Sequence, residues 1–154
     1  MGQALPHHKV RLPSWAKADT RMWCKFLEDF NGVGIQVAVV EEDWDFQVFS
    51  DAAGQGGFGI YWQGHWCAEE WPHSWKKGGR SIAFLELFPL VAAVVMWGAL
   101  FANKKVTFRV DNLAVVNVVN RQSARDTHVL RLLRMFVHEC LMKNIVFRAK
   151  HVPG

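Results

Sequence analysis

The spacing of apolar and polar positions changes along the chain, and this spacing predicts the order of its elements. Apolar residues recur at helical spacing from Trp15 to Phe30, where Ser14 can cap a helix and Asn31-Gly32 can stop it. Further helices are predicted at 83–102, 113–119 and 127–142. Strands are predicted where β-branched or alternating runs end at glycine, asparagine or acidic residues, namely at 35–40, 46–52, 58–63, 65–70, 105–110 and 145–152.

This order predicts the class of fold. From residue 46 the chain is predicted to run through three strands, a helix, a strand, two helices and a last strand. Short links favour an antiparallel meander for the first three strands, and the later strand–helix crossovers favour parallel pairing with right-handed connections. We therefore expect an α/β domain at 46–154 with a mixed sheet covered by helices. It would follow a connector at 1–45 with one amphipathic helix and one short strand.

The most apolar stretch of the chain is predicted to lie in the core and not in a membrane. Residues 87–102 carry no charge, but they fall short of the ~20 residues that a spanning helix needs, and Pro89 interrupts them. The first eight residues are polar and lack the apolar region of a signal peptide. Three widely spaced cysteines favour reduced thiols and no zinc site. We expect an intracellular protein, cytoplasmic or nuclear, without a membrane partner.

Composition and charge add two expectations. Eight Trp and eleven Phe predict a core rich in aromatic side chains. The 18 Lys and Arg residues against 14 Asp and Glu residues give a net charge of +4, which suits a polyanionic partner without requiring one.

Three carboxylates stand out by their placement. Asp51 and Asp111 each end a predicted strand, and Glu86 lies near the start of the apolar helix. All three follow strongly apolar residues, where an ionised carboxylate is costly unless a cation meets it. Separate structural roles are also open, because Asp111 shares a strand face with Arg109 and because acidic residues often cap helices.

A shared site for the three carboxylates would have a definite chemistry. An oxygen-only cluster suits Mg²⁺ or Mn²⁺ better than zinc. Two such ions ~3.5–4 Å apart can activate a water on one side of a phosphate and stabilise the leaving oxygen on the other. The sequence therefore allows a hydrolase of phosphodiesters.

The amino-acid sequences of these segments resemble motifs of the ribonuclease H domain. Phe49-Ser50-Asp51-Ala52-Ala53-Gly54 is similar to its first-strand motif, Leu85-Glu86-Leu87 to its helix motif and Val110-Asp111-Asn112 to its second aspartate motif. Three further sequence segments are more specific. They resemble the ribonuclease H domain of DIRS-type (tyrosine-recombinase) retrotransposon polyproteins, which follows the reverse transcriptase. They are Tyr61-Trp62-Gln63-Gly64-His65-Trp66, Asn120-Arg121-Gln122-Ser123 and His151-Val152-Pro153-Gly154.

The resemblance implies a fold and an activity. The fold would be a ribonuclease H-like mixed five-stranded sheet flanked by helices. Asp51, Glu86 and Asp111 would bind two Mg²⁺ ions, which Mn²⁺ can replace, and would cleave the RNA strand of an RNA–DNA hybrid. The reverse transcriptase domain of the same polyprotein would be a partner. Members of the family continue into a final helix with a fourth acidic ligand, whereas this chain ends at Gly154, so we expect that helix to be missing.

This departure leaves three functions open. The chain could be a working metal-dependent endoribonuclease, a catalytically dead module that still binds nucleic acid, or a non-functional fragment with exposed core. Retention of all three acids favours the first, and the early C-terminus favours the second.

Further residues are candidates for holding the substrate. The N–H groups at Ala53 and Gly54 could approach a phosphate backbone, although a plain hairpin turn explains the glycines equally well. Asn112 could donate to a sugar hydroxyl or could cap a helix. Arg121 and Gln122 belong to a polar basic loop that is open to solvation or to phosphate contacts. His151 could assist proton transfer, against a structural or solvated role.

Overall fold

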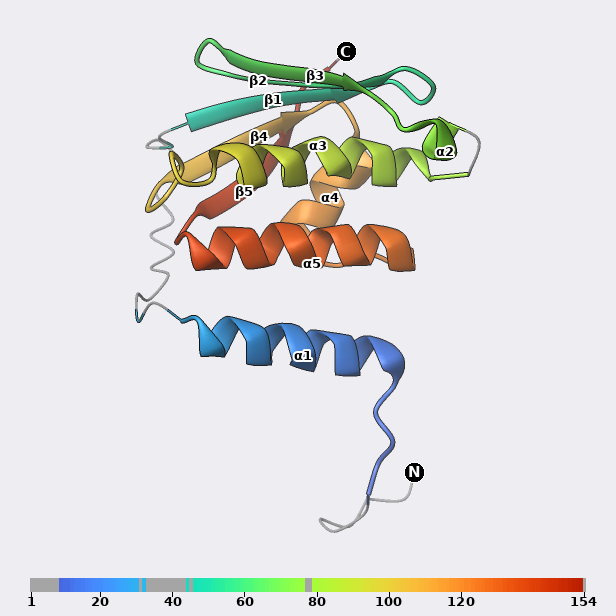
Figure 1. The fold of residues 1–154 in the computed structure, drawn as a ribbon, viewed down its shortest axis with the longest axis vertical. Coiled ribbons are helices and arrows are strands. Elements are labelled where there is room, and N and C mark those ends of the chain that lie inside the picture. Colours follow the sequence, from blue (N-terminus) through green and yellow to red (C-terminus); the bar gives the residue numbers. More distant parts are fainter. Residues whose placement is uncertain (1–8, 31, 33–43, 45, 77–78, 154) are drawn as a thin grey trace.

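The computed structural model describes residues 9–30, 32, 44, 46–76 and 79–153, and its centre is a five-stranded sheet of order β3-β2-β1-β4-β5 (Figure 1). The strands are β1 (Phe46–Ala52), β2 (Gly57–Trp62), β3 (His65–Glu70), β4 (Lys105–Val110) and β5 (Val146–His151). The helices are α1 (Ser14–Glu28), α2 (His73–Lys76), α3 (Ile82–Trp97), α4 (Leu113–Arg121) and α5 (Thr127–Met142).

The sheet combines the two kinds of pairing that the sequence predicts. β1 pairs with β2 and β2 with β3 in antiparallel register, with Phe49 opposite Tyr61 and Ile60 opposite Cys67. β1 pairs with β4 in parallel, with Ser50 beside Val110, and β4 pairs with β5 in the same direction. The mixed five-stranded sheet flanked by helices is therefore confirmed, and β1 lies at its centre between the two halves.

Helices α3, α4 and α5 lie on one face of the sheet (Figure 1). Side chains from both layers fill the space between them, and residues such as Val48, Leu87, Phe108 and Phe136 are fully buried there. Phe108 and Phe136 meet edge to face at 5.2 Å between ring centroids. Burial of apolar area at ~25 cal/mol per Å² is the main force that holds the helices on the sheet.

Helix α3 is the buried core helix that its apolar sequence predicts. Ser81 caps it by accepting from the backbone N–H of Phe84 at 3.3 Å. The helix ends at Trp97, five residues before the predicted end, and a chain of turns follows. A Cβ at Gly98 would lie 2.1 Å from the carbonyl oxygen of Val94, so the backbone at this point requires glycine. No helix in the described part of the chain is long and apolar enough to cross a bilayer.

Helix α1 packs on α5, on the side of α5 away from the sheet (Figure 1). Arg134 of α5 donates from Nε to Asp19 Oδ1 at 2.7 Å and from Nη2 to the carbonyl oxygen of Trp15 at 3.2 Å. The prediction that Ser14 caps this helix is wrong, because Pro13 takes the N-cap position and no side chain caps it. The helix also ends at Glu28, two residues before the predicted end.

The remaining differences from the predicted elements are small. The segment predicted as a loop at 71–81 contains the short helix α2, and α4 continues two residues beyond the predicted end. Gln122 ends α4 in the left-handed region at φ 50°. The strand predicted at 35–40 lies outside the described residues.

Candidate metal centre

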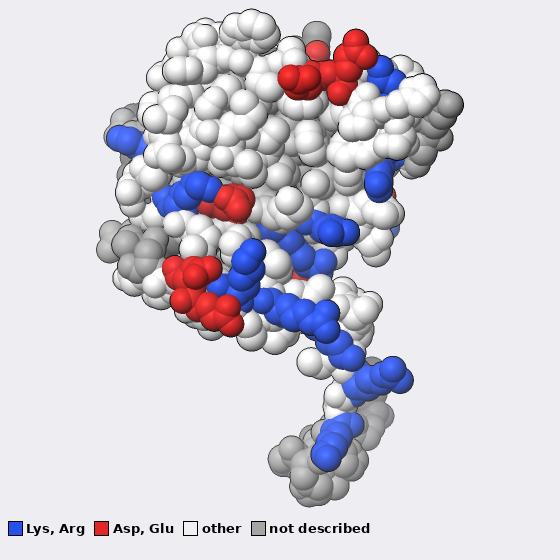
Figure 2. Space-filling view, in the orientation of Figure 1, with Lys and Arg blue, Asp and Glu red and all other residues white. Residues whose placement is uncertain are grey.

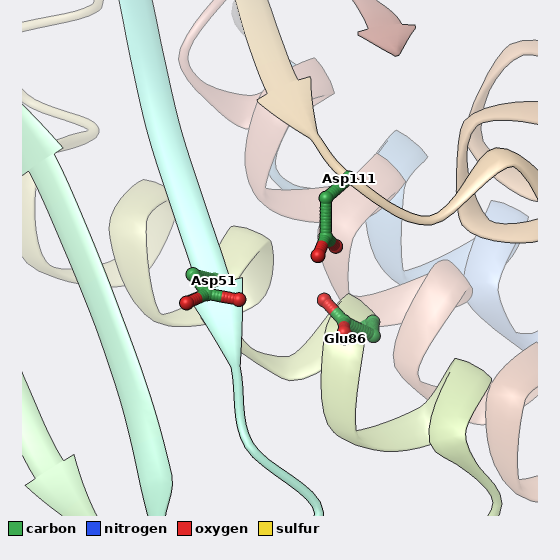
Figure 3. A group of neighbouring side chains, drawn as sticks. All are labelled: Asp51, Glu86 and Asp111. Carbon is green, nitrogen blue, oxygen red and sulfur yellow. The ribbon is translucent and has the colours of Figure 1, made fainter. Parts of the chain in front are cut away.

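Asp51, Glu86 and Asp111 come together at one edge of the sheet (Figure 3). One carboxylate oxygen from each residue lies within 4.8 Å of the corresponding oxygens of the other two. Asp51 and Asp111 are exposed, whereas Glu86 is 5% exposed. The cluster is therefore open to solvent on the side of the two aspartates and closed on the side of the glutamate.

The topology explains why residues so distant in sequence converge. β1 and β4 are parallel neighbours, so their carboxyl ends meet at the same edge of the sheet. The register places Ser50 beside Val110, and the next residue along each strand direction is Asp51 or Asp111. α3 starts at this edge and packs on β1, which brings Glu86 of its second turn under the two strand ends.

The electrostatics of Glu86 follow from this position. Burial raises the pKa of its carboxyl from 4.5 to about 7, and the neighbouring Asp111 and Asp51 carboxylates add to the rise. Its Oε2 atom is buried without a hydrogen-bond partner among the described residues. A buried, unpaired carboxylate oxygen beside two further carboxylates is costly for the folded protein, and a cation would relieve that cost.

The structural alternatives for these acids do not hold. Arg109 Nε donates to Gln47 Oε1 at 3.2 Å, and no ion pair among the described residues joins Arg109 to Asp111. The caps of the two helices at this edge are Ser81 for α3 and Asn112 for α4, so neither Glu86 nor Asp111 serves as a cap. Helix capping therefore explains neither Glu86 nor Asp111, and an ion pair with Arg109 does not explain Asp111.

The residues present fit a hard divalent cation. Carboxylate oxygens are the donors that Mg²⁺ and Mn²⁺ prefer, and no sulfur or imidazole belongs to the cluster. The spacing within 4.8 Å allows shared ligation of a cation, and the orphaned Glu86 oxygen supplies a donor that the fold leaves unused. Asp51, Glu86 and Asp111 are the residues that would hold it.

The turn after β1 holds Ala53 and Gly54. The Ala53 N–H donates to the carbonyl oxygen of Gly57 at 2.9 Å, so this donor is used within the turn. The Ala53 carbonyl accepts from Trp71 Nε1 at 2.6 Å, which ties the turn to the loop after β3. A Cβ at Gly54 would meet only Ile82 Cδ1 at 3.5 Å, so the packing of the protein itself does not require glycine there.

Of the other predicted substrate residues, Asn112 and His151 lie beside the cluster, whereas Arg121 and Gln122 lie at the far end of α4. Asn112 uses its side-chain oxygen to cap α4, accepting from the N–H groups of Ala114 and Val115 at 3.0 and 3.3 Å. His151 ends β5, and its Nε2 atom lies 2.9 Å from the carbonyl oxygen of Asp111. Arg121 and Gln122 are exposed at the end of α4.

The sequence patterns do not predict the contacts of three further residues. Trp71 donates from a loop eighteen residues away to the turn after β1. Asn120 pairs both of its amide atoms with the backbone of Ala149, donating at 2.9 Å and accepting at 2.8 Å, and so joins α4 to the edge strand β5. Gly57 is required because an added Cβ would lie 1.9 Å from the Glu69 carbonyl oxygen. Asn120 belongs to a segment that resembles the family and Gly57 ends a glycine-rich turn, but neither pattern reveals these contacts.

Comparisons with known proteins identify the fold. No family model and no curated protein sequence matches the chain. Among solved structures, RNase H1 from the halophilic archaeon Halobacterium salinarum is 17% identical with a TM-score of 0.49, over 70% of this chain and 85% of that chain. The N-terminal RNase H domain of a Mycobacterium tuberculosis protein, solved as a fusion with maltose-binding protein, is 13% identical with a TM-score of 0.51, over 70% of this chain and 88% of that chain. The second similarity, together with the sheet order β3-β2-β1-β4-β5, shows that the domain has a ribonuclease H-like fold.

Proposed function

We propose that the chain is a metal-dependent endonuclease that hydrolyses the RNA strand of RNA–DNA hybrids. The observation that carries this proposal is the cluster of Asp51, Glu86 and Asp111, within 4.8 Å of one another at the carboxyl ends of β1 and β4. The ribonuclease H-like fold supports it, because the structural neighbour with a TM-score of 0.51 is described as an RNase H domain. The net charge of +4 suits a polyanionic substrate.

The exposed and the buried residues of the cluster would have different roles. Asp51 and Asp111 are open to solvent and would take the positions nearest the substrate phosphate. Glu86, buried behind them, would fix the cations from the protein side. The chemistry that two Mg²⁺ or Mn²⁺ ions supply when bound is activation of a water and stabilisation of the leaving oxygen. His151, whose ring lies against the Asp111 carbonyl, is placed to accept or donate a proton at the edge of the cluster.

Other residues would hold the hybrid beside the cluster. Gly54 is exposed in the turn next to Asp51 and leaves room for a close backbone approach, with Ala53 fixing the turn. Asn112 neighbours Asp111 and would face a sugar hydroxyl, while Arg121 and Gln122 would meet phosphates further along the strand.

The test is cleavage of a labelled RNA–DNA hybrid in Mg²⁺ or Mn²⁺, with Asp51→Asn beside the parent. Loss of a carboxylate from a metal cluster removes several kcal/mol of transition-state stabilisation, so we expect cleavage to fall at least about a hundredfold. The matched control is Asp29→Asn, an exposed carboxylate at the end of α1, which should cut at the parental rate. Mg²⁺ should also raise the melting temperature of the parent and not that of Asp51→Asn.

The outcomes separate the functions. If Asp51→Asn cuts as fast as the parent, the metal site is placed wrongly. A folded parent that binds the hybrid without cutting it would be a nucleic-acid-binding module and not an enzyme. A parent that neither binds nor cuts would reject both functions.

We also propose that the domain derives from a DIRS-type retrotransposon polyprotein and works beside its reverse transcriptase. The support is the amino-acid sequence of three segments, 61–66, 120–123 and 151–154, which resembles that of the DIRS-type domain. The genomic locus tests this, because a reading frame for a reverse transcriptase should precede the first codon of this chain. A locus without any such frame would reject the proposed origin and leave the proposed chemistry unaffected.

A further inference from the structure

Helix α1 and the residues before it carry a row of basic side chains that packing does not use. We call Lys9, Arg11, Lys17, Arg21 and Lys25 the basic ridge; all five are exposed. Figure 2 shows the corresponding band of Lys and Arg side chains along α1 and the segment that leads into it. Within the described parts of the chain, none of the five forms an ion pair.

The geometry of α1 separates the basic ridge from the contact with α5. Met22 and Phe26 line the groove between α1 and α5, together with Asp19, which pairs with Arg134. Lys17, Arg21 and Lys25 follow one another at every fourth position, so they share one side of the helix at intervals of about 6 Å. A shallow hollow of about 360 Å³ on that side is lined by all three. The basic ridge therefore points away from the body of the protein.

The basic ridge and the carboxylate cluster lie in different layers of the molecule but toward the same side. In Figure 1, α1, α3 and α5 all begin on the right of the view, with α5 lying between α3 and α1. Ser81, which caps α3, donates to Asp126, which caps α5, at 3.4 Å, and Arg80 lies 3.2 Å from His128 at the same junction. Arg125 and Trp15 then line one groove, so basic groups continue from the start of α3 towards α1.

We infer that the basic ridge binds the sugar–phosphate backbone of a nucleic-acid duplex that extends beyond the carboxylate cluster. The inference rests on the proposed function for the identity of the ligand. Backbone phosphates recur every ~3.4 Å along each strand, so a row of charges about 6 Å apart can meet them without a particular base sequence. The carboxylate cluster and the ribonuclease H-like fold of the same chain favour a nucleic-acid duplex as the ligand. An anionic membrane is the competing ligand, because Trp23 and Leu27 of α1 are 57% and 63% exposed.

The experiment compares binding and cleavage of a short hybrid of about one helical turn with a long hybrid of about three turns. The test variant is Lys17→Gln, Arg21→Gln, Lys25→Gln, because glutamine keeps the helix propensity and removes the charge. The first control exchanges lysine and arginine at the same three positions and so keeps the positive charge: Lys17→Arg, Arg21→Lys, Lys25→Arg. The second control is Lys104→Gln, an exposed lysine in the turns before β4. Thermal unfolding of every variant should match that of the parent.

We expect the triple glutamine variant to bind the long hybrid about tenfold more weakly at low salt, and the slope of log K against log salt to become shallower by about 2 to 3. Binding and cleavage of the short hybrid should stay at the parental level. Both controls should match the parent on both hybrids.

An unchanged salt slope in the triple glutamine variant would overturn the inference while cleavage by the parent kept the proposed function. If the folded parent does not cleave the hybrid, but its salt slope is steeper than that of the triple glutamine variant, the proposed function is rejected and the inference stands. Tighter binding of the parent to phosphatidylserine vesicles than to the long hybrid, abolished by the triple variant, would assign the basic ridge to membranes and also overturn the inference.

Discussion

The two faces of the sheet differ in what covers them. On the face that carries the helices, Val48, Ile60 and Phe108 are at most 3% exposed. On the opposite face, Phe49 is 43% exposed and Trp66 is 73% exposed, above a shallow groove that ends at Asp51 and Asp111. The same strands thus supply a dry core on one side and an accessible surface on the other.

This difference explains the uneven environment of the carboxylate cluster. Glu86 belongs to the covered side, where burial raises the pKa of its carboxyl, whereas Asp51 lies on the open side with Phe49. A site between the covered and the open face can therefore combine a buried carboxyl of raised pKa, Glu86, with two carboxylates that a substrate can reach. Substitutions that act on one face at a time test this division.

The largest expected effect is in the covered face. Phe108→Ala removes a fully buried ring that packs against Phe136, so it should lower the free energy of unfolding by about 4 kcal/mol. Urea titration followed by circular dichroism measures this loss. A loss below about 1 kcal/mol would mean that the helices do not pack on the sheet as described.

The second effect concerns the buried carboxylate and depends on pH. The folded pKa of Glu86, about 7, lies above its ordinary value of 4.5, so the folded state keeps a proton that the unfolded state has lost between these values. Without metal, stability should therefore fall as pH rises from 4.5 to 7. Glu86→Gln removes this fall and should be more stable than the parent at pH 8 by about 3 kcal/mol.

Urea titrations at pH 4 and pH 8 in the presence of a chelator measure the difference, which should vanish at pH 4. Glu28→Gln, at an exposed position, is the matched control and should leave the pH dependence of the parent unchanged. Mg²⁺ at pH 8 should stabilise the parent and not Glu86→Gln. Equal pH dependence in the parent and in Glu86→Gln would place the titrating group elsewhere.

A smaller effect is expected where α4 covers the edge of the sheet. Asn120→Ala removes two hydrogen bonds to the backbone of Ala149, and we expect a loss of about 1.5 kcal/mol in the free energy of unfolding. Amide hydrogen exchange at Ala149 should speed up more than exchange in β1. Asn117→Ala, at another exposed position of α4, is the control that should leave exchange at Ala149 unchanged.

The smallest effect is expected on the open face. Trp66→Ala removes a side chain that is mostly in solvent, so the free energy of unfolding should change by only about 0.5 kcal/mol. The comparison with Phe108→Ala is the direct measure of how the faces differ. A loss as large as that of Phe108→Ala would show that the open face is covered in solution.

The sequence predicts what depends on local spacing and fails where distant contacts decide. Period and turn residues place β1, β3, β4 and α5 closely, because each of these elements is set by its own residues. The predicted end of α3 lies five residues beyond its end at Trp97, because apolar residues continue through the turns that follow the helix. The cap at Pro13 in place of Ser14 was likewise not predicted.

For the site, the sequence predicts the three acids but not their difference in exposure. The ends of the predicted strands and the resemblance to family motifs single out Asp51, Glu86 and Asp111. Parallel pairing of β1 with β4 then brings the two aspartates together. The buried, orphaned oxygen of Glu86 depends on how α3 packs, and the clamp of Asn120 on Ala149 depends on a contact between segments far apart in the chain. Such contacts carry no periodic signal.

The central position of β1 has a consequence for how the chain folds during synthesis. β1 reaches β2 through a short turn, so the meander can form as soon as residue 70 has left the ribosome. Its other edge must wait for β4, which follows α3, and long-range parallel pairing is intrinsically slow. Until β4 has been made, the edge of β1 that will pair with it is unpaired, and an unpaired strand edge can pair with another chain.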